Sequence, residues 1–480
     1  MNCLNKCLTA ALALAAGCAT TVEDRARSAA SFTDRLRTET DGYFAENPGP
    51  LALTNALALA RERTLKLTVQ ELESKLSRTR RAQAFSAFLP NVEASLGRFT
   101  ANGDVTALPY MRVRDGDGWG DEASVVVTQP VFAPVAWTMF VESNYGVRIA
   151  DLVRDRAQEL LDVQVAACFY KAAIADRMVE TYRLQLASGE ALVARVAKLA
   201  DEGYALSAER ARAEARVAAD ELGLLESRHR RDKARSDLCE ILSFWPLADF
   251  PVDGDSILEV ERAPWTFIDT NGVSRAVSRE ELASADCAEF VWQGLLRRKD
   301  LYAGDETVNL RKAQVVEALA GFLPNIVLGG GGTHLSYESL AAKGWFGGLA
   351  GTWAAFEGFR TVEAYVAAKV RREAEFKLQE DRMLAVITSV ADAWRGWKET
   401  GDRVRVARKM KEATALDWEE AQKRYEDGNE TLSRVLDKLA EKDAAEVRAV
   451  SAEYAAALAE VTLRQAMGLR LFEGSEKDEK

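Results

Sequence analysis

The stretch Phe88-Leu-Pro-Asn91 occurs a second time in the sequence, as Phe322-Leu-Pro-Asn325. Each copy follows a charged, alanine-rich stretch with helical character and precedes a short run with strand character. The two copies lie 234 residues apart, which indicates a tandem duplication of one structural unit. Proline ends a helix, so Pro90 and Pro324 mark equivalent helix-to-strand junctions in the two repeats.

Two further pairs of landmarks support the duplication. Gly203 and Gly428 each follow a long helical arm, and each comes 39 residues before a short stop signal, at Leu242-Ser243 and Met467-Gly468. Phe132 and Phe356 form another pair, at a similar offset. These offsets are about ten residues shorter than the 234 residues between the two tetrapeptides. A loop of different length is therefore expected between the two strands of each repeat.

Proline is absent from two long parts of the chain, between Val135 and Trp245 and from Asn325 to the C-terminus. Because proline costs about 3 kcal/mol inside a helix, these proline-free runs rich in Ala, Glu, Arg and Leu predict very long helices. The 480 residues carry a net charge of −11, which argues against a nucleic acid partner.

The N-terminus has the pattern of a targeting segment. A short apolar run follows Lys6, and Leu14-Ala-Ala-Gly-Cys18 is similar to a lipobox. We predict a signal peptide over 1–17 and lipidation of Cys18; an ordinary cleaved signal is the alternative. In known bacterial lipoproteins, a residue such as Ala19 in place of Asp directs the protein to the outer membrane of a Gram-negative envelope.

Cys168 and Cys239 lie 35 and 36 residues on either side of Gly203. In an antiparallel hairpin that turns there, the two cysteines would stand at the same height. A disulfide is possible in an oxidising periplasm, but packed helices usually hold Cα atoms beyond the limit of about 7 Å. Two small buried residues are the favoured interpretation, and Cys287 has no evident partner.

The remaining pattern alternates long helical and short strand-like runs. Residues 19–50 are polar and end in a loop, and a helix follows with Thr54 as a possible cap. An apolar seam of coiled-coil type is predicted on the last helix, at Leu436, Leu439, Val447, Val450, Tyr454, Leu458 and Val461. The predicted helices are 51–88, 136–200, a return helix to 242, 305–321, 358–425 and 432–467; the strands are 92–97, 123–128, 326–336 and 345–355, with a loop at 109–122 and a charged tail at 473–480.

The strands carry a membrane-like pattern. Trp345, Leu349 and Trp353 lie on one face of a strand, at a spacing that compares with an apolar band between aromatic girdles. The Gly-rich run 329–332 indicates close strand packing or barrel curvature. Four strands cannot close a membrane barrel alone. If these are membrane strands, several chains must share one barrel, and three chains would give twelve strands.

These features together resemble the TolC-like outer-membrane efflux factors over essentially the whole mature chain. The resemblance rests on the two Leu-Pro junctions, on the strand exits Gln129–Phe132 and Trp353–Gly358, and on the glycine-containing tips. It implies a mainly α fold in which duplicated helical hairpins form a trimeric α-barrel, while four strands per chain contribute to a shared 12-stranded outer-membrane β-barrel. It also implies an exit duct of a tripartite efflux or type I secretion system, with a periplasmic adapter and an inner-membrane pump as partners and no cofactor.

The family closes its periplasmic end with side chains at the hairpin tips. The resemblance places Tyr425 on the gating tyrosine, Asp437 on an aspartate of the pore constriction, and Glu209 on a carboxylate partner of the tyrosine. Glu430 stands where the family has a gating arginine, and Arg434 where it has a second ring aspartate. The exchanged charges leave two alternatives, a tip network with altered pairs or a solvated charged turn. Gly203 and Gly428 are the expected adapter contacts.

The predicted domains follow the duplication. No enzyme site emerges, because His229 and His334 lack companions at metal-ligand spacing and no catalytic motif is present. The alternative function is a non-pore periplasmic adapter or a lipid-anchored coiled-coil scaffold. The predicted segments are a signal peptide (1–17), a lipidated N-terminal segment (18–50), a first repeat (51–243), an equatorial segment (244–300), a second repeat (301–468) and a charged tail (469–480).

Overall fold

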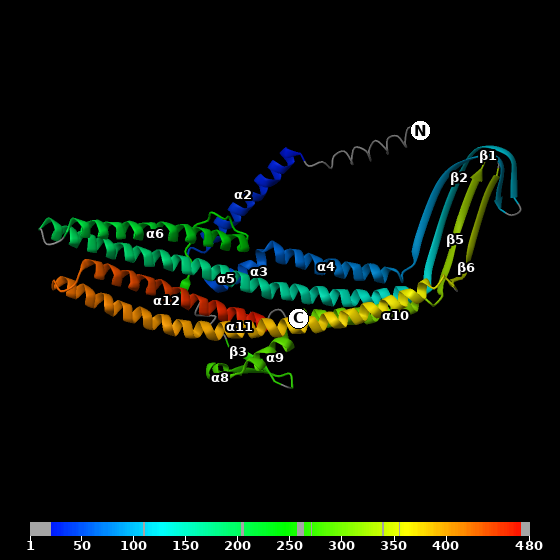
Figure 1. Ribbon diagram of the computed structural model, residues 1–480. Coiled ribbons are helices and arrows are strands. Elements are labelled where there is room, and N and C mark those ends of the chain that lie inside the picture. Colours follow the sequence, from blue (N-terminus) through cyan, green and yellow to red (C-terminus); the bar gives the residue numbers. More distant parts are fainter. Residues whose placement is uncertain are drawn as a thin grey trace. The chain divides into compact units, whose positions relative to one another are not determined.

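The computed structural model describes residues 21–108, 111–202, 206–256, 264–269, 271–337, 340–354 and 356–471 (Figure 1). Its helices are α2 (Val22–Glu46), α3 (Leu53–Arg63), α4 (Leu65–Ser86), α5 (Pro134–Asp201), α6 (Ser207–Leu242), η1 (Gly254–Ser256), α8 (Arg279–Ser284), α9 (Cys287–Arg297), α10 (Lys299–Ala320), α11 (Arg360–Glu426) and α12 (Leu432–Ala466). Its strands are β1 (Asn91–Leu108), β2 (Met111–Phe132), β3 (Trp265–Ile268), β4 (Ser274–Val277), β5 (Asn325–Tyr337) and β6 (Leu340–Thr352).

One order of elements occurs twice. The run α4–β1–β2–α5–α6 is repeated as α10–β5–β6–α11–α12 (Figure 1). The chain divides into two compact units, and each unit contains parts of both repeats. One unit comprises Val69–Ala157 and Arg297–Thr388, which include the strands of both repeats; the other comprises the described residues up to Thr68, Gln158–Leu296 and the described residues from Ser389.

Four strands form one antiparallel sheet in the order β1-β2-β5-β6. Asn91 and Asn325, the last residues of the duplicated tetrapeptide, open β1 and β5 and pair with Thr128 and Thr352. The loop predicted at 109–122 is wrong over most of its length, because β2 already begins at Met111. A strand ladder is made of backbone hydrogen bonds, so a charged, Gly-rich sequence continues the strand once its long partner is in place.

The Gly-rich run of β5 packs closely against its neighbours. A Cβ atom on Gly331 would lie 2.4 Å from the carbonyl oxygen of Val125 on β2, and one on Gly330 would lie 3.2 Å from that of Phe346 on β6. Side chains at these two positions would push the strands apart. This contact agrees with the close strand packing predicted for the run.

Equivalent hydrogen bonds close the two helix-to-strand junctions, although their donors are different residue types. The side chain of Gln129, at the end of β2, donates from Nε2 to the Phe88 carbonyl oxygen at 2.7 Å. At the equivalent position Trp353 donates from Nε1 to the Phe322 carbonyl oxygen at 3.1 Å. Each bond satisfies a carbonyl at the end of a helix that Pro90 or Pro324 stops.

The two return helices also end alike. Ser243 (φ 55°) follows α6 and Gly468 (φ 74°) comes shortly after α12, and both adopt the left-handed conformation. The amides that follow, Phe244 N and Leu469 N, donate to Cys239 O and Arg464 O, each at 2.8 Å. This is the Schellman end of a helix, which explains the two stop signals in the sequence.

The helix predicted over 51–88 is broken at Thr64, which has ψ 120°. The Thr64 hydroxyl donates to the carbonyl oxygen of Ile241 at 2.9 Å, a residue 177 positions away. Thr54 lies inside α3 and is not its cap, because Ala52 occupies the cap position without a side-chain bond. The break lets α3 bury Leu53, Leu57 and Ala60 in the core.

The segment 19–50, whose polar composition predicts no helix, contains the helix α2. Thr21 caps α2: its hydroxyl accepts from Asp24 N at 3.1 Å, and Asp24 Oδ2 accepts from Thr21 N at 3.3 Å. The other end of α2 packs on aromatic residues, where Phe44 stacks on Phe250 with ring centroids 4.7 Å apart. The Thr-x-x-Asp pattern was the available signal.

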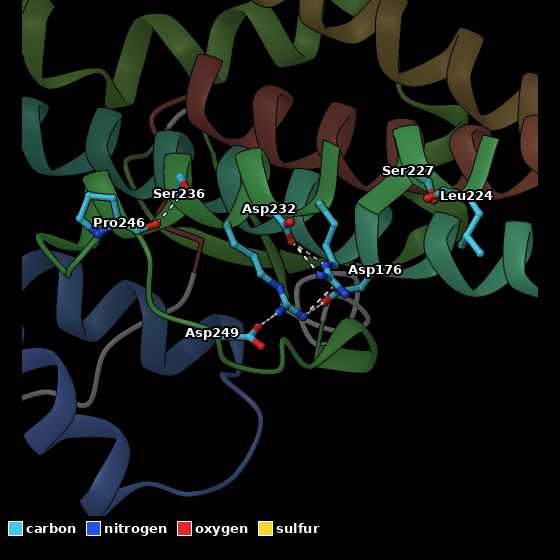
Figure 2. Close-up of polar contacts among 9 residues, drawn as sticks. Asp176, Leu224, Ser227, Asp232, Ser236, Pro246 and Asp249 are labelled. Carbon is cyan, nitrogen blue, oxygen red and sulfur yellow. Dashed lines mark hydrogen bonds and ion pairs between the residues drawn. The ribbon is translucent and has the colours of Figure 1, made fainter. Parts of the chain in front are cut away.

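Arginine side chains tie α6 to its surroundings. Arg235 donates to Asp176 on α5 at 2.9 Å and also bonds Asp249 in the loop after α6. Figure 2 shows both carboxylates directed at this one guanidinium. Ser236 adds a 2.8 Å bond to the Pro246 carbonyl oxygen, so this loop is held along the helix (Figure 2).

The segment between the repeats folds around an aromatic cluster. The β3–β4 hairpin and α9 place Trp265 and Phe290 within 6.4 Å of each other between ring centroids. Both rings also contact Trp397 on α11, with centroids 6.4 and 6.2 Å apart. Arg464 of α12 lies over the Trp265 ring at 4.2 Å, so this segment is anchored on both helices of the second hairpin.

The predicted apolar seam of α12 is only partly buried. Leu439 and Val461 are buried, whereas the other five residues of the seam are half-buried. Ala445, Ala449 and Ala457 are buried beside them. Small residues at these positions let the neighbouring helices approach closely.

We expect Gly304→Ala to destabilise the protein by about 1–3 kcal/mol, because a Cβ atom there would lie 1.8 Å from Gln379 Oε1. Gln379 cannot move away easily: it is buried and donates to the Leu301 carbonyl oxygen at 3.0 Å. The matched control is Gly401→Ala on α11, where no atom lies within 4 Å of the new Cβ, so a gain of up to about 1 kcal/mol is expected. Urea unfolding of both variants in detergent tests the difference.

Candidate functional site at the hairpin tips

The tip of the second hairpin is a tight glycine turn. Gly428 has φ 73°, and its amide donates to Tyr425 O at 3.0 Å while Asn429 N donates to Arg424 O at 2.8 Å. This Schellman motif ends α11, and Thr431 then caps α12 by accepting from Arg434 N at 3.4 Å. Gly428 therefore stands at the tip, and a larger residue there would be strained.

The structure describes both flanks of the first hairpin tip, but the predicted tip residue Gly203 lies outside the described residues. The predicted lipidation site Cys18 also lies outside them. The α5 helix ends at Asp201 and α6 begins at Ser207. Glu209 accepts the Leu206 amide at 3.0 Å through Oε2, which satisfies one of the free amides at the start of α6.

The structure brings Tyr425 and Glu209 into electrostatic range of each other, although they lie on different hairpins. Burial and the negative charge of Glu209 raise the pKa of Tyr425, and the nearby Arg195 opposes them. Arg195 on α5 also forms an ion pair with Glu426 at the end of α11. The two tips are thus linked by Arg195–Glu426, a pair that sequence reasoning missed because its members are 231 residues apart.

The other three predicted tip residues remain separate within the described part of the chain. Asp437 and Arg434 are exposed on α12, and no ion pair involves either of them among the described residues. Glu430 accepts the Thr431 amide at 3.2 Å through Oε1. One copy of the chain thus brings Tyr425 within electrostatic range of Glu209, and no ion pair between Glu430 and Arg434 occurs among its described residues.

The cysteines that could have formed a disulfide are free. Cys239 is buried and Cys168 is half-buried, and both are unbonded, as is Cys287. Burial raises the pKa of the Cys239 thiol to about 12, so it stays protonated and packs as a small apolar residue. No group of three or more potential metal ligands occurs among the described residues.

Residues 292–469 match the family model described as outer membrane efflux protein. Over these residues the chain is therefore similar to outer membrane efflux proteins. The match covers the second repeat, and it confirms the family resemblance inferred from the duplicated junctions and tips. Channels of this family are transport ducts and not enzymes. No significant match was found among curated protein sequences.

Solved structures extend the likeness to the fold of nearly the whole chain. The outer membrane channel CmeC of Campylobacter jejuni is 15% identical, with a TM-score of 0.71 over 88% of this chain and 87% of that one. VceC of Vibrio cholerae is 16% identical, with a TM-score of 0.68 over 88% and 97%. The open state of MtrE of Neisseria gonorrhoeae is 18% identical, with a TM-score of 0.69 over 88% and 89%.

These comparisons confirm the predicted fold class, in which helical hairpins are combined with strands that contribute to a shared barrel. Within the described ranges, no helix combines the length and the apolar character needed to cross a membrane.

Proposed function

We propose that three copies of this chain form an outer-membrane exit duct of a tripartite efflux or type I secretion system. The sheet order carries the proposal: β1 and β6 are the outer strands of the four-stranded sheet, and each pairs with a single strand among those that the structure describes. Unpaired strand edges are not tolerated in a membrane, so the edges must meet those of other copies. Three copies supply twelve strands, which is within the range of known barrels.

The experiment is a mass measurement and a planar-bilayer recording on one detergent-extracted sample. A conducting trimer is the expected result. A non-conducting monomer would overturn the proposal and leave the non-pore adapter or scaffold as the better interpretation.

The proposed partners follow from the same arrangement. The hairpin tips at Gly203 and Gly428 would meet a periplasmic adapter, which connects the duct to an inner-membrane pump. Cysteine substitutions at Asn429 or Glu202, which flank the tips, would allow crosslinking to a co-expressed adapter. Crosslinks from these positions and none from an exposed position such as Arg279 would support tip-to-tip docking.

We also propose that Cys18 carries the lipid anchor in the Gram-negative outer membrane. The lipobox supports the assignment, and the capped start of α2 at Thr21 leaves the cysteine just ahead of a regular helix. Labelling with radioactive palmitate should be lost in Cys18→Ala and kept in Cys168→Ala.

We expect Tyr425→Ala to raise the single-channel conductance and Asp437→Ala to weaken cation selectivity. The family resemblance assigns Tyr425 to the closure of the pore, and the influence of Glu209 on its pKa supports that role; three copies of the exposed Asp437 would form a carboxylate ring. Planar-bilayer recordings in asymmetric salt measure both quantities. If the conductance and the selectivity both match the wild type, the gate assignment is wrong.

A further inference from the structure

Arg216 lies between two buried aspartates. Its Nη2 atom is 2.6 Å from Asp443 Oδ2, and its Nε atom is 3.0 Å from Asp220 Oδ1. The side chains of Asp443 and Asp220 are 7% and 8% exposed, and that of Arg216 is 24% exposed. Arg216 and Asp220 belong to α6 and Asp443 to α12, so the cluster joins the first hairpin to the second.

The surrounding residues complete this contact without adding net charge. On α5, Gln185 donates from Nε2 to the Asp443 backbone carbonyl at 3.3 Å, and a Cβ atom on Gly189 would lie 3.1 Å from Asp220 Oδ2. On α12, Lys442 pairs with Glu446 at 3.7 Å, and its ammonium lies 4.7 Å from the Trp418 ring of α11. These two charges cancel, so the buried cluster holds two carboxylates and one guanidinium.

We propose that Arg216, Asp220 and Asp443 form a proton-operated clasp that holds the two hairpins together more tightly as the pH falls. The cluster carries one uncompensated negative charge when both carboxylates are ionised. Burying such a charge is costly, whereas uptake of one proton makes the cluster neutral. A protonated Asp443 still has an acceptor oxygen for Arg216, so the contact between α6 and α12 is kept, while Asp220 holds Arg216 in place from within α6.

The position of Asp443 supports it as the group that takes the proton. Burial, together with the negative charges of Asp220 and Glu446, raises its pKa to about 6, against the opposing charges of Arg216 and Lys442. Its second oxygen, Oδ1, is buried and has no hydrogen-bond partner among the described residues. Leaving one buried oxygen without a hydrogen bond costs less free energy for a protonated carboxyl than for a carboxylate.

The sign follows from proton linkage. A solvated aspartate has a pKa of about 3.9, so between that value and about 6 the packed hairpins bind more protons than parted hairpins do. The contact is therefore strongest at low pH and weakens as the pH rises through about 6. Between about pH 5 and about pH 7.5 the equilibrium constant for packing should change by up to about tenfold per chain.

The clasp is separate from the tip residues. Asp443 is eleven positions beyond the first residue of α12, so it lies about 17 Å along the helix from that end. The contact therefore controls how firmly the hairpins are held together behind Tyr425 and Asp437. Its effect on a pore rests on the proposed function, whereas the hairpin contact itself does not.

The test is hydrogen exchange of the α6 and α12 amides in the purified full-length protein at about pH 5 and about pH 7.5, corrected for the intrinsic rate. In the wild type, opening around Arg216 and Asp443 should be up to about tenfold less frequent at the lower pH. Asp443→Asn, which is permanently neutral and of the same shape, should show the low opening frequency at both pH values. Asp437→Asn is the matched control on an exposed turn of the same helix and should behave as the wild type does.

A wild-type pH response in Asp443→Asn would overturn the proposal, as would frequent opening of this variant at both pH values. Arg216→Met supplies a second criterion: it should loosen the contact at about pH 7.5 and recover most of it at about pH 5. Bilayer recordings on the same samples separate the two proposals. If hydrogen exchange shows the expected pH response but the samples do not conduct, the proposed duct is contradicted and the proposed clasp is supported.

Discussion

Arg464→Met is expected to lower the free energy of unfolding by about 3–5 kcal/mol, the usual cost of removing one partner from a buried ion pair. Arg464 is 1% exposed and donates from Nη2 to Glu460 Oε1 at 3.0 Å, while Nη1 donates to the Pro264 carbonyl oxygen at 3.4 Å. Its guanidinium also covers the Trp265 ring. Without it, the ion pairs of the buried Glu460 among the described residues would be reduced to the longer contact with Arg279, at 3.7 Å.

Urea unfolding of the purified protein measures the loss. Arg448→Met, an exposed arginine on the same helix, is the control and should change stability little. The double variant Arg464→Met with Glu460→Leu should recover much of the loss, because a buried pair can be replaced by apolar residues at small cost. If the single variant unfolds as the control does, the buried pair does not stabilise the fold as argued.

The second large effect is expected on the face of the sheet that carries Trp345 and Leu349. Leu349 is 67% exposed and lies on the same face of β6 as Trp345, which is 88% exposed. In a lipid-facing band, Leu349→Arg should cost about 2–4 kcal/mol near the bilayer midplane. A trimer would carry three such arginines, so the yield of assembled protein in the outer membrane should fall sharply.

Ala350→Arg is the matched control, because the next residue of a strand points to the opposite face of the sheet. A channel-facing arginine at that position should be tolerated. For both variants, the amount of heat-modifiable trimer in outer-membrane fractions measures the yield of assembled protein. Equal yields for the two substitutions would contradict the assignment of the Trp345–Leu349 face to lipid.

Much of the architecture could be predicted from local sequence signals. The duplicated tetrapeptide located both junctions, and the proline-free runs predicted α5 and α11, which span 68 and 67 residues. Gly428 predicted the tip because that turn requires a residue in the left-handed backbone conformation, which glycine adopts readily. The family resemblance paired Tyr425 with Glu209, and the structure places the two within electrostatic range.

Other features depended on partners far away in the sequence. The break at Thr64 requires the Ile241 carbonyl oxygen, and β2 continues through a loop-like sequence because β1 lies beside it. The helix α2 was missed because its polar composition outweighed one capping pattern. In each case the local propensity was weak, and a tertiary contact or a cap decided the conformation.

Local sequence patterns are sufficient to specify the duplicated plan, the long helices, the strands with one aromatic face and the glycine turns. Local periodicity and residues with restricted backbone conformations specify these features. The choice of ion-pair partners, as in Arg195–Glu426 and Arg216–Asp443, depends instead on how the helices pack. Such pairs join residues more than 220 positions apart, and the packing of the helices, rather than any sequence pattern, selects one partner among many similar charges.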